Sequence, residues 1–132
     1  MDLQLAEYLG PGIAGLIFIV LMSRVRDEVR LPLNAVLVTG ASGVYMSGGF
    51  GLWEVAYAMA AGPLLGYFAL RSYRVIGVGW LCHAAWDILH HLYGDPIWPF
   101  MPSSSLGCLI FDTLIGAWFL CGVRPALARA HR

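Results

Sequence analysis

The sequence contains no lysine, although it is 132 residues long and carries eight positively charged side chains, all of them arginine. Without lysine the protein cannot form a Schiff base with a carbonyl compound such as retinal, and it has no phosphate-loop lysine. Charged residues of both signs make up only 12% of the chain, against about 25% in soluble domains. The formal net charge is zero and no basic run is present, so nucleic acid is not an expected partner.

Cysteine is also scarce. The three residues, Cys82, Cys108 and Cys121, are odd in number and show no C-x-x-C spacing, which argues against a disulfide framework or a zinc ribbon. The N-terminal region lacks the basic start of a secretory signal and carries Asp2 and Glu7 instead. We therefore expect a retained first membrane span rather than a removed signal peptide.

Hydrophobic residues dominate what is present: they make up 59% of the chain, and the mean hydropathy is +0.71. These values are typical of a multi-pass membrane protein. Since one spanning helix needs about 20 residues, the length of the chain allows around five spans. Almost no residues are left for a domain outside the membrane. The predicted fold is thus all-α, a polytopic transmembrane helix bundle that forms a single domain over residues 1–132. Its five predicted spans cover residues 3–22, 31–49, 50–70, 75–93 and 105–123.

The arginines predict the orientation of this bundle. With five spans, they all lie in loops or in the tail on one side, and by the positive-inside rule that side faces the cytoplasm. The N-terminus is then expected outside and the C-terminus inside. The arginines occupy the first loop (Arg24, Arg26, Arg30), the third loop (Arg71, Arg74) and the C-terminal tail (Arg124, Arg129, Arg132).

The fourth predicted helix carries the most informative pattern in the chain. At about 100° per residue, His83, Asp87 and His90 fall within an arc of roughly 60°, and His91 lies at its edge. Ionisable side chains cost at least a few kcal/mol each in hydrocarbon, so they usually face a protein interior or a wet cavity and mark function. This helix is therefore the expected functional centre.

Two further acidic residues are predicted at similar depth on neighbouring helices: Glu54 on the third and Asp112 on the fifth. Imidazoles and carboxylates that meet inside a helix bundle are suitable ligands for zinc or iron. The leading hypothesis is a membrane metalloenzyme near the outer leaflet, with a divalent metal ion that activates water toward a small or lipid-like substrate. Hydrolase and oxidoreductase chemistry both stay open. The predicted metal ligands are His83, Asp87, His90, His91, Glu54 and Asp112, and Glu54 and Asp112 are also the predicted catalytic residues.

Three other interpretations fit the same residues. The histidines and carboxylates can form a buried polar network that fixes the register of the helices. They can form a proton or ion path, although the inner half offers only Asn34, Thr39 and Ser42 to continue it. The small loops also permit an accessory subunit of a larger membrane complex, or a homo-oligomer.

The Asp87-x-x-His90-His91 segment resembles one histidine box of membrane di-iron desaturases and hydroxylases. Those enzymes use several such boxes, whereas this chain has four histidines in total, one of them in the tail. The likeness covers a single helix, and membership of that family is not expected.

Several short motifs are spread along most of the chain: Gly-Leu-Trp53-Glu54, Arg71-Ser-Tyr-Arg74, Gly79-Trp80-Leu, Trp86-Asp87-x-x-His90-His91-x-Tyr93-Gly94, Pro102-x-Ser-Ser and Gly107-Cys108. In this pattern the chain resembles a family of small, uncharacterised bacterial multi-pass membrane proteins. The resemblance implies the helix-bundle fold and a bacterial inner membrane location. It implies no activity, because the family has none assigned.

Overall fold

A computed structural model describes residues 3–47 and 49–123, and it confirms the all-α class. The described part contains five α-helices, one 3-10 helix and no β-strand. Asp2 and the tail arginines Arg124, Arg129 and Arg132 lie outside the described residues. In chain order the elements are α1 (Leu3–Arg24), α2 (Asp27–Ala41), η1 (Ser42–Ser47), α3 (Leu52–Ala69), α4 (Tyr73–Tyr93) and α5 (Ser104–Cys121).

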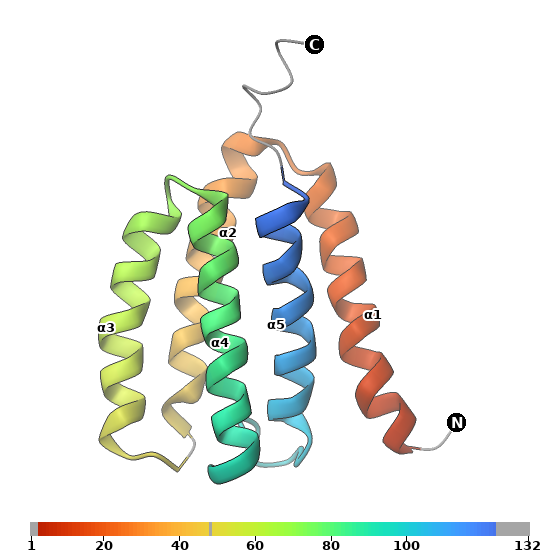
Figure 1. The fold of residues 1–132 in the computed structure, drawn as a ribbon, viewed down its shortest axis with the longest axis vertical. Coiled ribbons are helices and arrows are strands. Elements are labelled where there is room, and N and C mark those ends of the chain that lie inside the picture. The colour runs from red at the N-terminus through yellow and green to blue at the C-terminus, as the bar shows by residue number, and fades with distance from the viewer. Residues whose placement is uncertain (1–2, 48, 124–132) are drawn as a thin grey trace.

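Successive helices run in opposite directions along one long axis (Figure 1). The α1–α2 and α3–α4 connections lie at the upper end of the view, and η1 and the α4–α5 loop lie at the lower end. The most extensive contact joins α4 to α5, and α1 packs on the other side of α5. All the described arginines therefore lie at or near the upper end of the molecule.

The second predicted span is interrupted, which the sequence analysis did not anticipate. An unbroken helix was expected over residues 31–49, but α2 ends at Ala41 and the chain continues as η1. The reason is local, because residues 40–47 contain two glycines and two serines, which are weak helix formers: Gly40, Ser42, Gly43 and Ser47. The chain then turns through Gly49 (φ 90°) and Gly51 (φ 58°), where only glycine adopts the backbone easily.

A buried arginine forms hydrogen bonds that join the upper ends of α1, α2 and α4. Arg30 on α2 donates hydrogen bonds to the Asp27 carboxylate, to the Tyr73 hydroxyl at 3.0 Å and to the Met22 carbonyl at 3.3 Å. The pairing leaves the guanidinium compensated although the residue is buried. The start of α4 and the end of α1 are thereby fixed to the first turn of α2.

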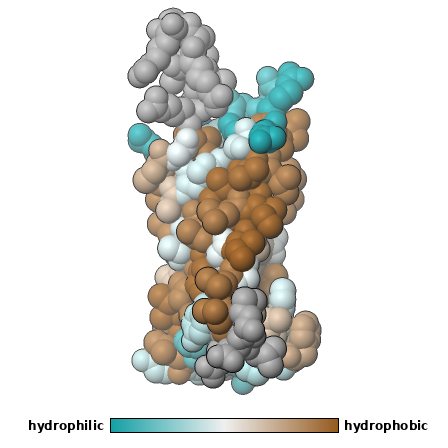
Figure 2. Space-filling view, turned by 90° about the vertical axis from the view of Figure 1, so that its right-hand side faces the viewer, coloured by the Kyte–Doolittle hydropathy of each residue, from teal (hydrophilic) through white to brown (hydrophobic). Residues whose placement is uncertain are grey.

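The distribution of polarity is the reverse of that in a soluble protein. The interior holds as many polar or charged residues as apolar ones, including Glu54, Asp87 and Asp112. Such residues are almost never fully buried in soluble domains unless they are paired. The outer surface is largely apolar along α1 (Figure 2), and on α3 Met59 is 71% exposed and Leu64 is 61% exposed.

Two helical stretches, Leu5–Arg24 and Ser104–Cys121, are long and apolar enough to cross a membrane. This finding is coarser than the predicted five spans. The α2 helix, with 15 residues, is short for a span because η1 interrupts it. Polar residues lower the hydropathy of α4, which carries Asp87 and three histidines.

The contact between α4 and α5 depends on two glycines that face each other. A Cβ atom on Gly77 would lie 3.0 Å from the Gly116 carbonyl oxygen and 2.7 Å from Cγ of Leu120, and a Cβ on Gly116 would lie 3.1 Å from the Gly77 carbonyl oxygen. Small residues at such a point let two helix backbones approach closely.

The Gly77→Ala substitution is predicted to lower the melting temperature of the purified protein in detergent. The added methyl group forces apart the backbones of α4 and α5, and overpacking of this kind costs about 1–3 kcal/mol. The matched control is Gly40→Ala in α2, where nothing lies within 4 Å of the new Cβ. Equal melting temperatures for the two variants would contradict the close packing of α4 on α5.

Candidate functional site

The polar stripe of α4 faces the interior of the bundle. His83 and Asp87 are 0% exposed and His90 is 1% exposed, which agrees with the arc expected from their helical spacing. His91, one residue further, is exposed. The interior of the lower half of the molecule is thus lined by three of the four α4 residues singled out in the sequence.

Both ring nitrogens of His83 are engaged by the protein. Nε2 lies 2.7 Å from the Val38 carbonyl oxygen, and Nδ1 lies 2.9 Å from the Tyr57 hydroxyl. A carbonyl oxygen only accepts, so Nε2 carries the proton, and in the neutral ring Nδ1 accepts the proton of Tyr57. His83 therefore connects the end of α2 to the middle of α3.

Asp87 is held by a tyrosine of the 3-10 helix. The Tyr45 hydroxyl donates to Oδ1 of Asp87 at 2.8 Å and lies 3.3 Å from the His83 carbonyl oxygen. The Tyr45 ring packs against the rings of His83 and His90, with centroid distances of 5.5 Å and 5.4 Å. Oδ2 of Asp87 is buried and has no hydrogen-bond partner. The interruption of the second helix thus places an aromatic hydroxyl on the central carboxyl group.

Glu54 and His90 form a buried pair between α3 and α4. Nε2 of His90 lies 3.1 Å from Oε1 and 3.3 Å from Oε2 of Glu54. The carboxylate also accepts the Trp86 indole N–H at 3.3 Å and the Phe50 backbone N–H at 3.3 Å. Nδ1 of His90 lies 3.2 Å from the Asp95 carbonyl, to which it donates. His90 therefore connects Glu54 on α3 to the loop that follows α4.

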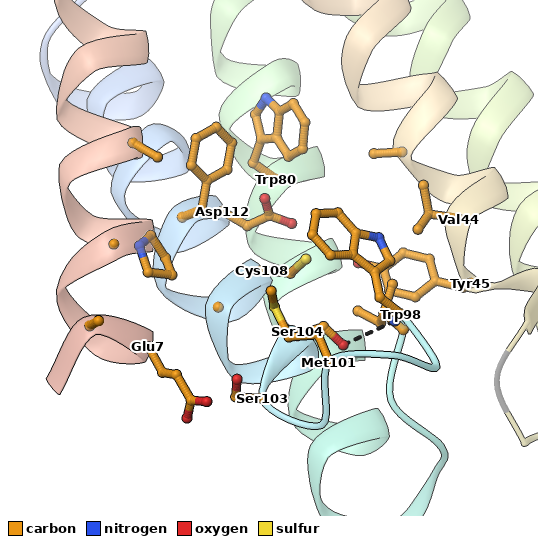
Figure 3. Close-up of a pocket in the computed structure, with 18 residues that line it drawn as sticks. Glu7, Val44, Tyr45, Trp80, Trp98, Met101, Ser103, Ser104, Cys108 and Asp112 are labelled. Carbon is orange, nitrogen blue, oxygen red and sulfur yellow. Dashed lines mark hydrogen bonds between the residues drawn. The ribbon is translucent and has the colours of Figure 1, made fainter. Parts of the chain in front are cut away.

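Asp112 differs from the other buried carboxyl groups because no described residue forms a hydrogen bond with it. It is 5% exposed and lies on the α5 face that meets α4. Its carboxyl group interacts electrostatically with that of Asp87 and points into a pocket of about 760 Å³ between α1, α4, α5 and η1 (Figure 3). Cys108, one turn earlier on α5, lines the same pocket.

The structure therefore divides the predicted site residues into two groups. Glu54 is paired with His90, whereas Asp112 faces the pocket. Among residues 3–47 and 49–123, no three His, Cys, Asp or Glu side chains converge closely enough to hold a metal ion. Metal ligation by the predicted set stays a prediction, and the ring nitrogens of His83 and His90 already lie within hydrogen-bond distance of protein groups.

Two tyrosines of the site were missed in the sequence. Tyr57 lies three residues after Glu54, on the same face of α3, and this spacing was a usable signal. Tyr45 stands among small residues of the second predicted span. Its contact with Asp87 depends on the change from α-helix to 3-10 helix at Ser42. The hydropathy of the segment does not predict this change.

Amide substitutions are predicted to distinguish Glu54, which has hydrogen-bond partners, from Asp112, which has none among the described residues. Each oxygen of Glu54 accepts from a group that can only donate, the Phe50 backbone N–H at Oε1 and the Trp86 indole N–H at Oε2. In Glu54→Gln the amide nitrogen must face one of these two donors, and the mismatch costs about 1–3 kcal/mol. In Asp112→Asn no hydrogen bond is lost, so the stability is retained. Thermal unfolding in detergent measures both variants. A larger loss of stability for Asp112→Asn than for Glu54→Gln would contradict this assignment of partners.

Comparison with known proteins places the chain in a family. Neither the curated proteins nor the solved structures gave a match. One family matches most of the sequence, and it confirms the expected membership of an uncharacterised family. The chain belongs to the family described as Family of unknown function (DUF6010), which matches residues 6–125.

Proposed function

We propose that this protein is a multi-pass integral membrane protein that binds a small, lipid-like molecule in the pocket beside Asp112 and handles protons there through its buried carboxyl groups. The observation that carries the proposal is an unpartnered, buried carboxyl group at the inner end of an apolar pocket. In this proposal all five helices cross the bilayer, and the resemblance of the motifs favours a bacterial inner membrane.

The dimensions of the helices support five crossings. At 1.5 Å per residue, α1 with 22 residues and α4 with 21 are each longer than about 30 Å, which is the thickness of the hydrocarbon core. The α2 helix and η1 together reach about 34 Å, because a 3-10 helix rises about 2.0 Å per residue. The shorter α3, with 18 residues, reaches about 27 Å.

The reversed polarity supports the same conclusion. In lipid there is no gain from burying apolar side chains, and polar groups must be satisfied inside the bundle. The apolar outer surface and the interior partners of Arg30, Glu54 and His83 agree with these two conditions. The arginines at the upper end of the bundle favour a cytoplasmic position for that end, which puts the pocket in the outer half of the membrane.

The pocket has the size and walls that an apolar ligand requires. Its volume of about 760 Å³ lies within the range of ligand sites. Small residues on α1, including Gly10 and Ala14, form one wall, and Phe111 and Cys108 on α5 form another. Since α1 contacts mainly α5, the pocket is bounded by a single outer helix on that side.

The groups behind the pocket can hold and move a proton. Asp112 meets the ligand, and Asp87, with one oxygen free of hydrogen bonds, interacts with it electrostatically. Behind Asp87, the Tyr45 hydroxyl donates to Oδ1 of Asp87 and lies 3.3 Å from the backbone carbonyl oxygen of His83. Carboxyl groups at such a position are suited to exchange a proton with a bound molecule.

Photo-labelling in lipid nanodiscs tests the proposal. A long-chain alcohol that carries a diazirine is expected to label α1 and α5 residues of the pocket, and an excess of unlabelled alcohol should suppress this labelling. Ala14→Phe fills part of the pocket and is expected to reduce the suppressible labelling several-fold. Peptide mass spectrometry locates the labelled residues.

The matched control is Ala60→Phe, which adds the same ring to an exposed alanine of α3 outside the pocket. This variant should label like the wild-type protein. Labelling that is spread evenly over the apolar surface, is not suppressed by competitor and is unaffected by Ala14→Phe would overturn the proposed binding function.

A further inference from the structure

The pocket beside Asp112 has an unbalanced charge. Two acidic residues, Glu7 at its rim and Asp112 at its inner end, contribute to its lining, and no arginine or histidine does among the described residues. Figure 3 shows the Glu7 carboxylate at the lower edge of α1 and the Asp112 carboxyl group deep between α4 and α5. Any charge that the pocket presents to a ligand is therefore negative.

The other buried carboxyl groups of the protein do have partners of opposite charge or donor character. Glu54 pairs with His90, and Oδ1 of Asp87 accepts a hydrogen bond from the Tyr45 hydroxyl. Asp112 has neither, and the neighbouring Asp87 adds a second acidic group whose Oδ2 is buried without a partner. A carboxylate in hydrocarbon costs several kcal/mol unless a positive charge compensates it. No described residue supplies such a charge at Asp112, so the group is either protonated or compensated by a cationic ligand.

Aromatic rings surround the position where that charge would bind. Tyr45, Trp80, Trp98 and Phe111 all line the pocket, and Figure 3 shows Trp80, Trp98 and Tyr45 around the Asp112 carboxyl group. Ring faces attract organic cations, by about 2 kcal/mol or more where water is excluded. Aromatic walls and a carboxylate together form a site for a weakly hydrated cation.

We infer that the ligand of this pocket is an organic cation with an apolar body, such as an alkyl amine or alkyl quaternary ammonium compound, whose head group binds Asp112. This inference rests on the proposed function and specifies its ligand. The alkyl part lies between α1 and α5, and the head group lies against the aromatic rings. Ligands with an anionic head group, such as fatty acids, are disfavoured because Asp112 and Asp87 would repel the head group.

Three photo-probes with the same diazirine-bearing alkyl chain test this inference in nanodiscs of zwitterionic lipid. One ends in trimethylammonium, one in a hydroxyl group and one in sulfonate. The trimethylammonium probe is expected to label the pocket at the lowest concentration. In Asp112→Asn its half-saturating concentration should rise at least about tenfold, since the bound cation loses its oppositely charged partner.

The hydroxyl probe provides the internal control, because its binding should change little in Asp112→Asn. Glu28→Gln removes an exposed carboxylate at the other end of the molecule and should leave all three probes unaffected. Equal labelling by the three probes, or no effect of Asp112→Asn on the trimethylammonium probe, would overturn the cation inference and leave the proposed lipid-like ligand intact. Failure of every probe to label the pocket would overturn both.

Discussion

The structure depends on one constraint: polar groups in the interior must find their partners inside the bundle, because the outer surface is apolar. Arg30, Glu54 and His83 meet this requirement with partners on other helices. Each partnership joins two helices, so the polar groups also fix how the helices are rotated. A network of this kind favours one register over others, at the cost of desolvating its members.

The same constraint draws attention to Asp112. In an interior where most carboxyl groups are paired, Asp112 is buried without a hydrogen bond and faces a pocket. Burying a carboxyl group without a hydrogen-bond partner lowers the stability of the folded protein. The proposed organic cation would supply the missing partner, so its binding is predicted to stabilise the protein.

Much of the fold could be predicted from the sequence, because the five apolar runs, their proline and glycine boundaries and the arginine loops are local features. The buried stripe of His83, Asp87 and His90 could also be predicted, since it follows from helical periodicity alone. The pairing of these residues with other helices could not. It depends on how α3 and α5 are rotated around α4, and depth alone gave no reason why Glu54 pairs with His90 while Asp112 faces a pocket. Tyr45 escaped prediction because its position depends on the 3-10 segment.

The central claim is that the apolar outer surface lies in lipid while the polar interior is sealed from water. Spin labels at Met59 and Leu64 on the exposed face of α3, introduced as single cysteines after Cys82, Cys108 and Cys121 are replaced, measure this directly in nanodiscs. The account predicts that both labels collide frequently with oxygen and rarely with a water-soluble nickel complex. Frequent collisions with the nickel complex at both positions would contradict it.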